Sequence, residues 1–179
     1  MSTITTPVIP ASRTTTPTPA RKTAPYEDWR PPITGVSLLI PVGVDALAVV
    51  DFLGSIMMPT GTVHTGQTPE QAAQDVLHGA PDGLPLLRRV VLTRSQTRRR
   101  KVITHVLATT PMTRADVGHL KYRDPRADVR VLPTMRIING LPTPARLLAL
   151  VGLQALATGE TAYLEGGLVR PYPPERVRQ

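Results

Sequence analysis

The sequence contains no cysteine. This absence excludes disulfide bonds, thiolate metal sites and a cysteine nucleophile. Aromatic residues are also scarce, at 3% of the chain, so the core must be built from leucine, valine, isoleucine and alanine. With so few aromatic rings, recognition of nucleobases by stacking is not expected.

Long apolar runs are missing as well. No run reaches the roughly 18 residues expected of a membrane-spanning helix. The amino terminus is rich in threonine and proline and lacks the charged and then apolar pattern of a signal peptide. We therefore expect a cytoplasmic protein that does not enter a membrane.

The composition that is present indicates a globular protein with a strong positive charge. The chain has 179 residues, 41% of them hydrophobic, and a formal net charge of +8. This length suits one domain with a tail. The charge favours anionic partners, but an arginine-rich soluble protein without such a partner would have the same charge, and both interpretations stay open.

The chain divides into three predicted parts. Residues 1–32 are dominated by threonine, proline and alanine and predict a flexible tail, with a polyproline docking segment as the alternative. Within this tail, Tyr26 and Trp29 could pin its end to the domain. Residues 33–170 form the predicted domain, and residues 171–179 form a short basic tail.

Apolar segments bounded by turn residues predict most of the strands. Residues 33–42 and 46–53 are rich in β-branched residues and predict two opening strands. Residues 83–94 and 101–112 flank a polar turn and predict an antiparallel pair. Residues 127–140 predict one or two further strands that end in an Asn-Gly turn.

The last predicted element is a helix. Thr143 is the expected cap, Pro144 suits the first helical position, and Gly159 is the expected end. The helix between them is apolar nearly all round. Such a helix is either buried in the domain or faces the second subunit of a homodimer.

A short glycine-bounded unit precedes residue 83 and begins with a well-defined helix start. Thr68 is a suitable cap, Pro69 suits the first position, and Gln71 can close a capping box. The following residues recur with helical spacing. One predicted face carries Ala72, Ala73, Val76 and Leu77, whereas the other carries Glu70, Gln71, Gln74, Asp75 and His78.

This unit resembles the Nudix box, in which a glycine-bounded loop and a helix carry glutamates that hold Mg²⁺ against a diphosphate. With the first glycine of the box at Gly61, the segment MPTG resembles the usual entry. Positions that the family favours are then occupied by Gly66, Ala72, Ala73 and Leu77. The resemblance covers roughly residues 33–158 and implies an α/β (α+β) fold with a mixed sheet sandwiched by helices.

The reactive positions of the box do not follow the family. Gln67 stands where the loop glutamate would be, Asp75 and Val76 replace the Arg-Glu pair, and Gly79 and Ala80 replace two metal-binding glutamates. Mg²⁺ needs about two carboxylates together with phosphate and water oxygens. We therefore expect no metal and no cofactor.

The resemblance leaves several functions open. The leading hypothesis is a catalytically degenerate Nudix-like domain that binds a nucleotide-like anion or an apolar metabolite, or that serves as a regulatory or partner-binding module. Alternatives are a Mg²⁺-dependent hydrolase of nucleoside diphosphate-linked compounds and a different, metal-free enzyme. The candidate ligand-binding residues are Gly61, His64, Gln67, Val76 and Ala80, and the candidate acids of the hydrolase are Glu70, Asp75 and Asp82.

A basic cluster at the predicted hairpin tip offers another function. Arginine side chains there could bind phosphates or the backbone of a nucleic acid. A solvated tip that only prevents edge-to-edge pairing of strands would have the same composition. The cluster consists of Arg94, Arg98, Arg99, Arg100 and Lys101, with Arg88 and Arg89 nearby.

The four histidines are scattered and do not indicate a metal site. His64 and His78 flank the box-like unit, but a third ligand is not identifiable. His105 lies among apolar residues of a predicted strand. We expect it to be a hydrogen-bonded residue of the core or of a sheet face.

Overall fold

The structure is a computed structural model that describes residues 31–97 and 100–172. The predicted tail up to residue 30, the hairpin residues Arg98 and Arg99, and the end of the chain from residue 173 lie outside the described residues. Among the described residues, no helix is long and apolar enough to cross a membrane.

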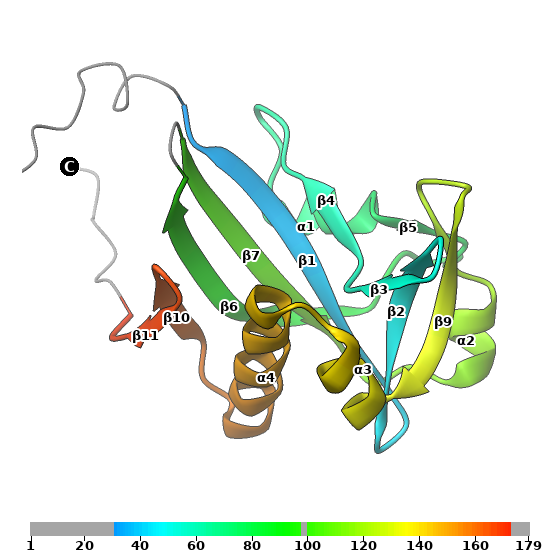
Figure 1. Cartoon of the computed structure of the whole chain (residues 1–179). Coiled ribbons are helices and arrows are strands. Elements are labelled where there is room, and N and C mark those ends of the chain that lie inside the picture. Colours follow the sequence, from blue (N-terminus) through cyan, green and yellow to red (C-terminus); the bar gives the residue numbers. More distant parts are fainter. Residues whose placement is uncertain (1–30, 98–99, 173–179) are drawn as a thin grey trace, which may run out of the picture.

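Within the described ranges, nine strands form one mixed sheet (Figure 1). Seven of them follow the order β11-β10-β6-β7-β1-β2-β3, while β4 pairs with β1 and β9 pairs with β2. The strands are β1 (Ile33–Val42), β2 (Ala46–Phe52), β3 (Ser55–Met57), β4 (Thr60–Thr62), β6 (Leu86–Gln96), β7 (Lys101–Thr109), β9 (Ala127–Pro133), β10 (Ala162–Glu165) and β11 (Leu168–Arg170). The short strands β5 (Leu77–His78) and β8 (Lys121–Tyr122) pair with each other.

The sheet is organised around β1, which is buried on both faces over most of its length. One edge of β1 runs parallel to β7. The opposite edge pairs with β4 over residues 35–37 and with β2 over residues 40–42. The sheet therefore divides at β1 into two arms. The continuous apolar sequence of β1 is typical of a strand that is covered on both faces.

Helices cover both faces of the sheet (Figure 1). The helices α1 (Pro69–Gln74) and α2 (Arg114–Gly118) pack with the even-numbered residues of β1. The helices α3 (Thr134–Gly140) and α4 (Thr143–Thr158) pack in the core cluster on the opposite face. This arrangement confirms the predicted α+β class with a mixed sheet sandwiched by helices.

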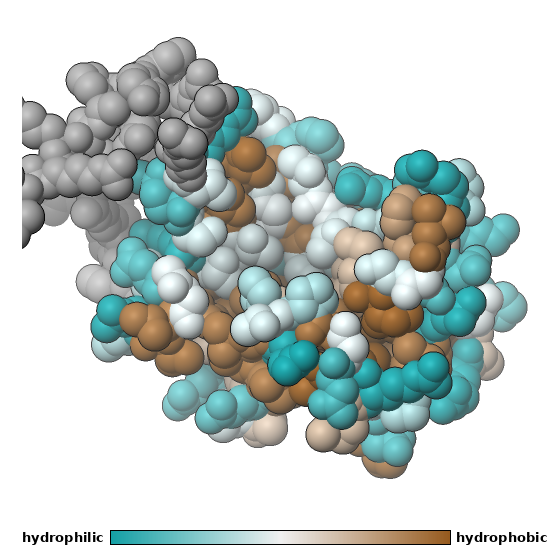
Figure 2. All heavy atoms as spheres, viewed as in Figure 1, coloured by the Kyte–Doolittle hydropathy of each residue, from teal (hydrophilic) through white to brown (hydrophobic). Residues whose placement is uncertain are grey.

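The helix α4 rests on the sheet through small residues. Ala149, Gly152 and Ala155 are buried, whereas Leu150 is 47% exposed. A band of apolar atoms is visible along this helix in Figure 2. The structure therefore shows that α4 is packed against the sheet on one side and is exposed on the other.

Two expectations for the C-terminal region are wrong. Residues 134–140 form α3 and not a strand with an Asn-Gly turn, because Ile137 and Ile138 are buried with helical spacing against Leu141. Thr143 is not a cap either. Pro142 holds that position, and its carbonyl accepts a hydrogen bond from the backbone N–H of Arg146.

The sequence pattern also left out several elements. The helix α2 and the strands β8, β10 and β11 were not expected, because they are short and lack a clear apolar period. The end of α4 is as predicted. Gly159 follows it in the left-handed conformation, with a φ angle of +81°.

We predict opposite effects for two substitutions of Gly152. A Cβ atom at this position would lie 3.4 Å from Leu39 Cδ2, an ordinary contact, so Gly152→Ala should raise the free energy of unfolding by up to about 1 kcal/mol through helix propensity. Gly152→Leu should lower it by about 1–3 kcal/mol, because the larger side chain cannot fit between helix and sheet.

Urea denaturation of the two variants measures both effects. Ala157→Leu is the matched control, because Ala157 is exposed on the same helix. Equal stability of Gly152→Leu and the parent chain would contradict the close packing of α4.

Candidate functional site

The start of α1 has the predicted capping box. Thr68 Oγ1 accepts a hydrogen bond from the backbone N–H of Gln71 at 3.2 Å. In return, Gln71 Oε1 accepts one from the backbone N–H of Thr68 at 2.9 Å. These reciprocal bonds satisfy two N–H groups that have no partner within the helix.

The helix α1 ends earlier than the sequence pattern suggested. It stops at Gln74, and Asp75 is its C-terminal cap. Val76 and Leu77 were expected on the same helix, but Leu77 instead pairs with Tyr122 across β5 and β8. The tertiary pairing of this short strand therefore overrides the helical spacing of the apolar residues.

Gly79 lies beyond the helix, in a backbone conformation that suits only glycine. Its φ angle is +101°, and a Cβ atom would lie 2.1 Å from the carbonyl oxygen of His119. Any side chain here would collide with the neighbouring backbone. A glutamate at this position is therefore incompatible with the local fold.

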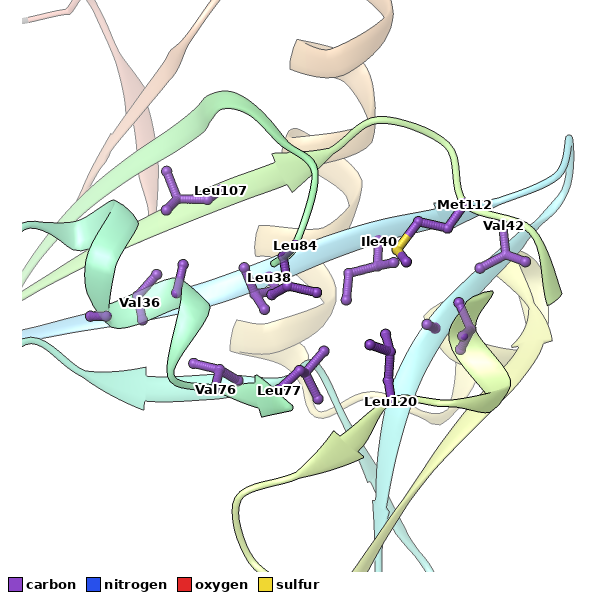
Figure 3. Close-up of a cluster of buried hydrophobic side chains, with 14 of the residues drawn as sticks. Val36, Leu38, Ile40, Val42, Val76, Leu77, Leu84, Leu107, Met112 and Leu120 are labelled. Atoms are coloured by element: carbon purple, nitrogen blue, oxygen red, sulfur yellow. The ribbon is translucent and has the colours of Figure 1, made fainter. Parts of the chain in front are cut away.

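Val76 is a residue of the core. Its side chain is 1% exposed, and a Cβ atom on Gly61 would lie 2.7 Å from Val76 Cγ2. Figure 3 shows Val76 among the apolar side chains beside Val36 and Leu77. Gly61 thus leaves the space that Val76 fills, and both residues contribute to packing at this point.

His64 and Gln67 do lie together, in a shallow recess of about 530 Å³ beside α1. Gln67 Nε2 donates a hydrogen bond to Asp75 Oδ2 at 2.6 Å, and Gln67 Oε1 accepts one from the backbone N–H of His64 at 3.1 Å. The recess is also lined by Gln71 and Gln74. We call this the amide recess, because three of the residues that line it are glutamines.

The remaining predicted ligand and acidic residues are elsewhere. Ala80 and Asp82 line a separate cavity of about 460 Å³ together with Met112 and His119. Glu70 is exposed on α1 and is not among the residues that line the amide recess. The structure therefore distributes the predicted ligand residues over the core, the amide recess and this second cavity.

The three candidate acids do not form a metal site in the described part of the chain. No group of three histidine or acidic side chains there is arranged to hold a metal ion. Asp75 already accepts the hydrogen bond from Gln67. The geometry offers no shared centre at which Glu70, Asp75 and Asp82 could bind Mg²⁺.

Several arginines near the hairpin stabilise the fold. The guanidinium group of Arg88 donates hydrogen bonds to the backbone carbonyls of Ala155 and Glu160 at the end of α4. The guanidinium carbon of Arg94 lies 5.8 Å from the centre of the Tyr163 ring. Arg100 is exposed at the hairpin end, while the contacts of Arg98 and Arg99 lie outside the described residues.

Arg89 connects two strands to the end of the described chain. Its Nη1 atom lies 3.3 Å from His105 Nδ1, and its Nη2 atom donates a hydrogen bond to Tyr172 Oη at 2.9 Å. Burial lowers the pKa of His105, the charge of Arg89 lowers it further, and Glu70 partly opposes this change. A neutral imidazole beside the guanidinium group is therefore favoured.

The sequence predicted a hydrogen-bonded sheet position for His105 but not its partners. The hydrogen bond from Arg89 to Tyr172 depends on the hairpin of β10 and β11, whose strands are too short to recognise. The clustering of arginines was the visible signal. It could not show that Arg88 and Arg89 point into structural contacts.

The sheet order, the helices on its two faces and the box-like unit together define a Nudix-like fold. Solved structures confirm this class. The solution structure of the E. coli ORF135 protein matches with a TM-score of 0.54 at 14% identity, covering 71% of this chain and 91% of that chain. The crystal structure of a MutT protein from Methanosarcina mazei Go1 gives 0.51 at 14% identity, covering 74% and 99%.

A third structure, a NUDIX hydrolase from Nitrosomonas europaea, matches with a TM-score of 0.54 at 11% identity, covering 76% of this chain and 79% of that chain. At these identities the similarity shows the fold alone. No protein-family model and no curated protein sequence matches the chain.

We predict that Thr68→Ala lowers the free energy of unfolding by about 1 kcal/mol, because it removes the cap of α1. Thermal or urea denaturation measures the change. Thr65→Ala is the control, since Thr65 is exposed in the preceding loop. An unchanged stability of Thr68→Ala would contradict a contribution from the capping box.

We also predict that His105 makes stability depend on pH. Its pKa in the folded chain is lowered, so the unfolded chain binds protons more readily and the contribution of neutral His105 is lost as the pH falls. The loss begins below the unfolded pKa of about 6.5. His105→Gln should flatten the curve of unfolding free energy between about pH 7 and pH 5.

Denaturation at a series of pH values measures this effect. His119→Gln is the matched control, because His119 is exposed. The prediction fails if His105→Gln and the parent chain lose stability in parallel over this interval.

Proposed function

We propose that this chain is a Nudix-like ligand-binding protein that has lost metal-dependent hydrolysis. The hydrogen bond from Gln67 to Asp75 is the observation that carries the proposal. An amide occupies the place of the loop glutamate and binds the one carboxylate left at the aligned box positions. A diphosphate hydrolase would need about two free carboxylates there to hold Mg²⁺.

The proposed ligand is a nucleotide-like anion bound at or near the amide recess. Glutamine amides can donate hydrogen bonds to phosphate oxygens without a bridging metal ion. The net charge of +8 favours the approach of an anion. An apolar metabolite has less support, because Gly61 and Val76, the apolar part of the predicted ligand set, are packed together in the core.

The first alternative is a hydrolase of nucleoside diphosphate-linked compounds that uses Glu70, Asp75 or Asp82. The similar structures include proteins named as a MutT protein and a NUDIX hydrolase. Strict dependence on Mg²⁺ or Mn²⁺ would favour this function. The separation of Asp75 and Asp82 into different cavities supports the binding function instead.

The second alternative is nucleic-acid binding through the hairpin of β6 and β7. Arg100 and Lys101 are exposed at its end. An affinity that falls steeply with salt concentration would favour this function, because it would report the release of counterions from phosphates. The structural contacts of Arg88 and Arg89 reduce the number of arginines that can serve it.

Two broader properties also remain proposals. We propose a cytoplasmic location and a homodimer that forms through the outer side of α4. The exposed Leu150 supports such a contact. A regulatory role would follow if a bound ligand changed the association of this surface with a partner.

We predict no product release from a panel of nucleoside diphosphate-linked and dinucleoside polyphosphate compounds with Mg²⁺, with Mn²⁺ or with EDTA. A compound of the same panel should instead raise the melting temperature in EDTA. At a concentration 100 times its Kd, the stabilisation should be about 2.7 kcal/mol. Gln67→Ala should weaken this binding, because it removes an amide of the recess.

The variants Asp75→Ala and Glu70→Ala test the same proposal from the opposite side. Metal-dependent turnover that either variant abolishes would show an active site rebuilt from displaced acids. A known Nudix hydrolase assayed in parallel is the control for active conditions. Stabilisation by ligand that requires Mg²⁺ would also count against metal-free binding.

A further inference from the structure

A cavity of about 490 Å³ lies where α4 meets the hairpin of β10 and β11. The helix ends at Gly159, whose φ angle of +81° turns the chain from α4 toward β10. Ala155 on the helix and Ala162 at the start of β10 have small side chains, which leave the corner between helix and hairpin open. We call this space the helix–hairpin cavity; Val151, Gln154, Glu160, Val169, Arg170 and Tyr172 are among its lining residues.

Part of the lining of the helix–hairpin cavity is apolar. Val151 on α4 is half-buried, and Val169 on β11 is 63% exposed. Tyr163 and Tyr172 add two aromatic rings, whose centres lie 6.2 Å apart in an edge-to-face arrangement. Figure 2 shows apolar atoms at the surface over the hairpin and the neighbouring α4. The volume lies within the roughly 300–1,000 Å³ typical of ligand pockets.

Two opposite charges line this cavity without pairing. Glu160 precedes β10 and Arg170 ends β11, so both lie at the end of the hairpin that is remote from its turn at residues 166–167. Within residues 31–97 and 100–172, neither side chain makes an ion pair or a hydrogen bond. Both charges are therefore available to a ligand in the cavity.

Gln154 and Tyr172 add uncharged polar groups to the same lining. The amide of Gln154 has no hydrogen-bond partner among the described residues. The hydroxyl oxygen of Tyr172 accepts a hydrogen bond from Arg89 Nη2 at 2.9 Å, which leaves its own proton free to donate. A few polar groups around an apolar surface are the usual means by which a pocket orients a small ligand.

We propose that the helix–hairpin cavity binds a free α-amino acid with an apolar side chain. The carboxylate of the ligand contacts Arg170, whose planar guanidinium group matches it, and the ammonium group contacts Glu160. The apolar side chain lies against Val151 and Val169. Because an α-amino acid carries both charges on one carbon atom, it can bridge a cation and an anion of the protein that do not meet each other.

A ligand with a single charge fits this cavity less well. A phosphate could contact Arg170, but the carboxylate of Glu160 would repel it. The site therefore differs in its chemistry from the amide recess, with which it shares no lining residue. The inference goes beyond the proposed binding of a nucleotide-like anion and does not depend on it.

Isothermal titration calorimetry of the full chain with L-leucine tests the proposal. Two analogues of leucine each lack one charge, since isocaproate has no ammonium group and isoamylamine has no carboxylate. Leucine should bind at least about tenfold more tightly than either analogue, because each analogue loses one hydrogen bond between charged groups. Glycine, which has both charges but no apolar side chain, should also bind more weakly than leucine.

Charge variants then assign the binding to this cavity. Arg170→Glu and Glu160→Arg should each abolish the binding of leucine, and the double variant that exchanges the two charges should restore it. Arg136→Gln and Glu165→Gln are matched controls, because both residues are exposed and neither lines the cavity. Circular dichroism confirms that each variant is folded. The rescue by charge exchange distinguishes this site from binding at another place.

Three results would overturn the proposal. Leucine could give no heat of binding, it could bind no more tightly than its two analogues, or its affinity could stay unchanged in both single charge variants. Each result leaves the proposed ligand-binding function intact, since thermal stabilisation by a panel compound in EDTA tests that function separately. Gln67→Ala, which alters the amide recess, should not change the binding of leucine.

Discussion

The contact between Val76 and Gly61 holds the box-like unit against the sheet, and the rest of the candidate site depends on it. The missing side chain of Gly61 leaves room for Val76, which also packs with Val36 in the core cluster of α1 and β1. A carboxylate in this buried place would need a partner or would have to lose its charge. The chain thus has a packed apolar side chain where the resemblance would place the glutamate of the Arg-Glu pair, and the pairing of β5 with β8 follows the end of α1.

Local signals in the sequence predicted the features that depend on neighbouring residues. The capping box of Thr68 and Gln71 and the glycine after α4 are set within a few positions, and both are confirmed. The early end of α1 and the helix α3 depend on distant partners: Tyr122 pairs with the strand after α1, and the sheet buries Ile137. Such tertiary contacts override local propensity and are not visible in one sequence.

The candidate site was predictable to the same limited extent. The sequence identified which residue types are missing from the box, and the structure brings His64 and Gln67 into one recess. It could not show that Ala80 lines a different cavity, because that depends on the path of the loop after Gly79. Nor could the sequence show that some arginines of the cluster make structural contacts. Arg88, for example, stabilises the end of α4 and does not add to the free positive surface.

A Nudix-like fold and the absence of glutamates from the box-like unit are compatible if the fold and the chemistry of the resembling family depend on different residues. The frame requires small or apolar residues such as Gly61 and Val76, and it survives at identities of 11–14%. The chemistry requires free carboxylates, and at the box Asp75 is already bound by Gln67 at 2.6 Å. A divalent cation bound through the other oxygen of Asp75 would still lack a second carboxylate at the box positions. An anion needs no carboxylate, because the second N–H of the Gln67 amide can donate a hydrogen bond to it directly.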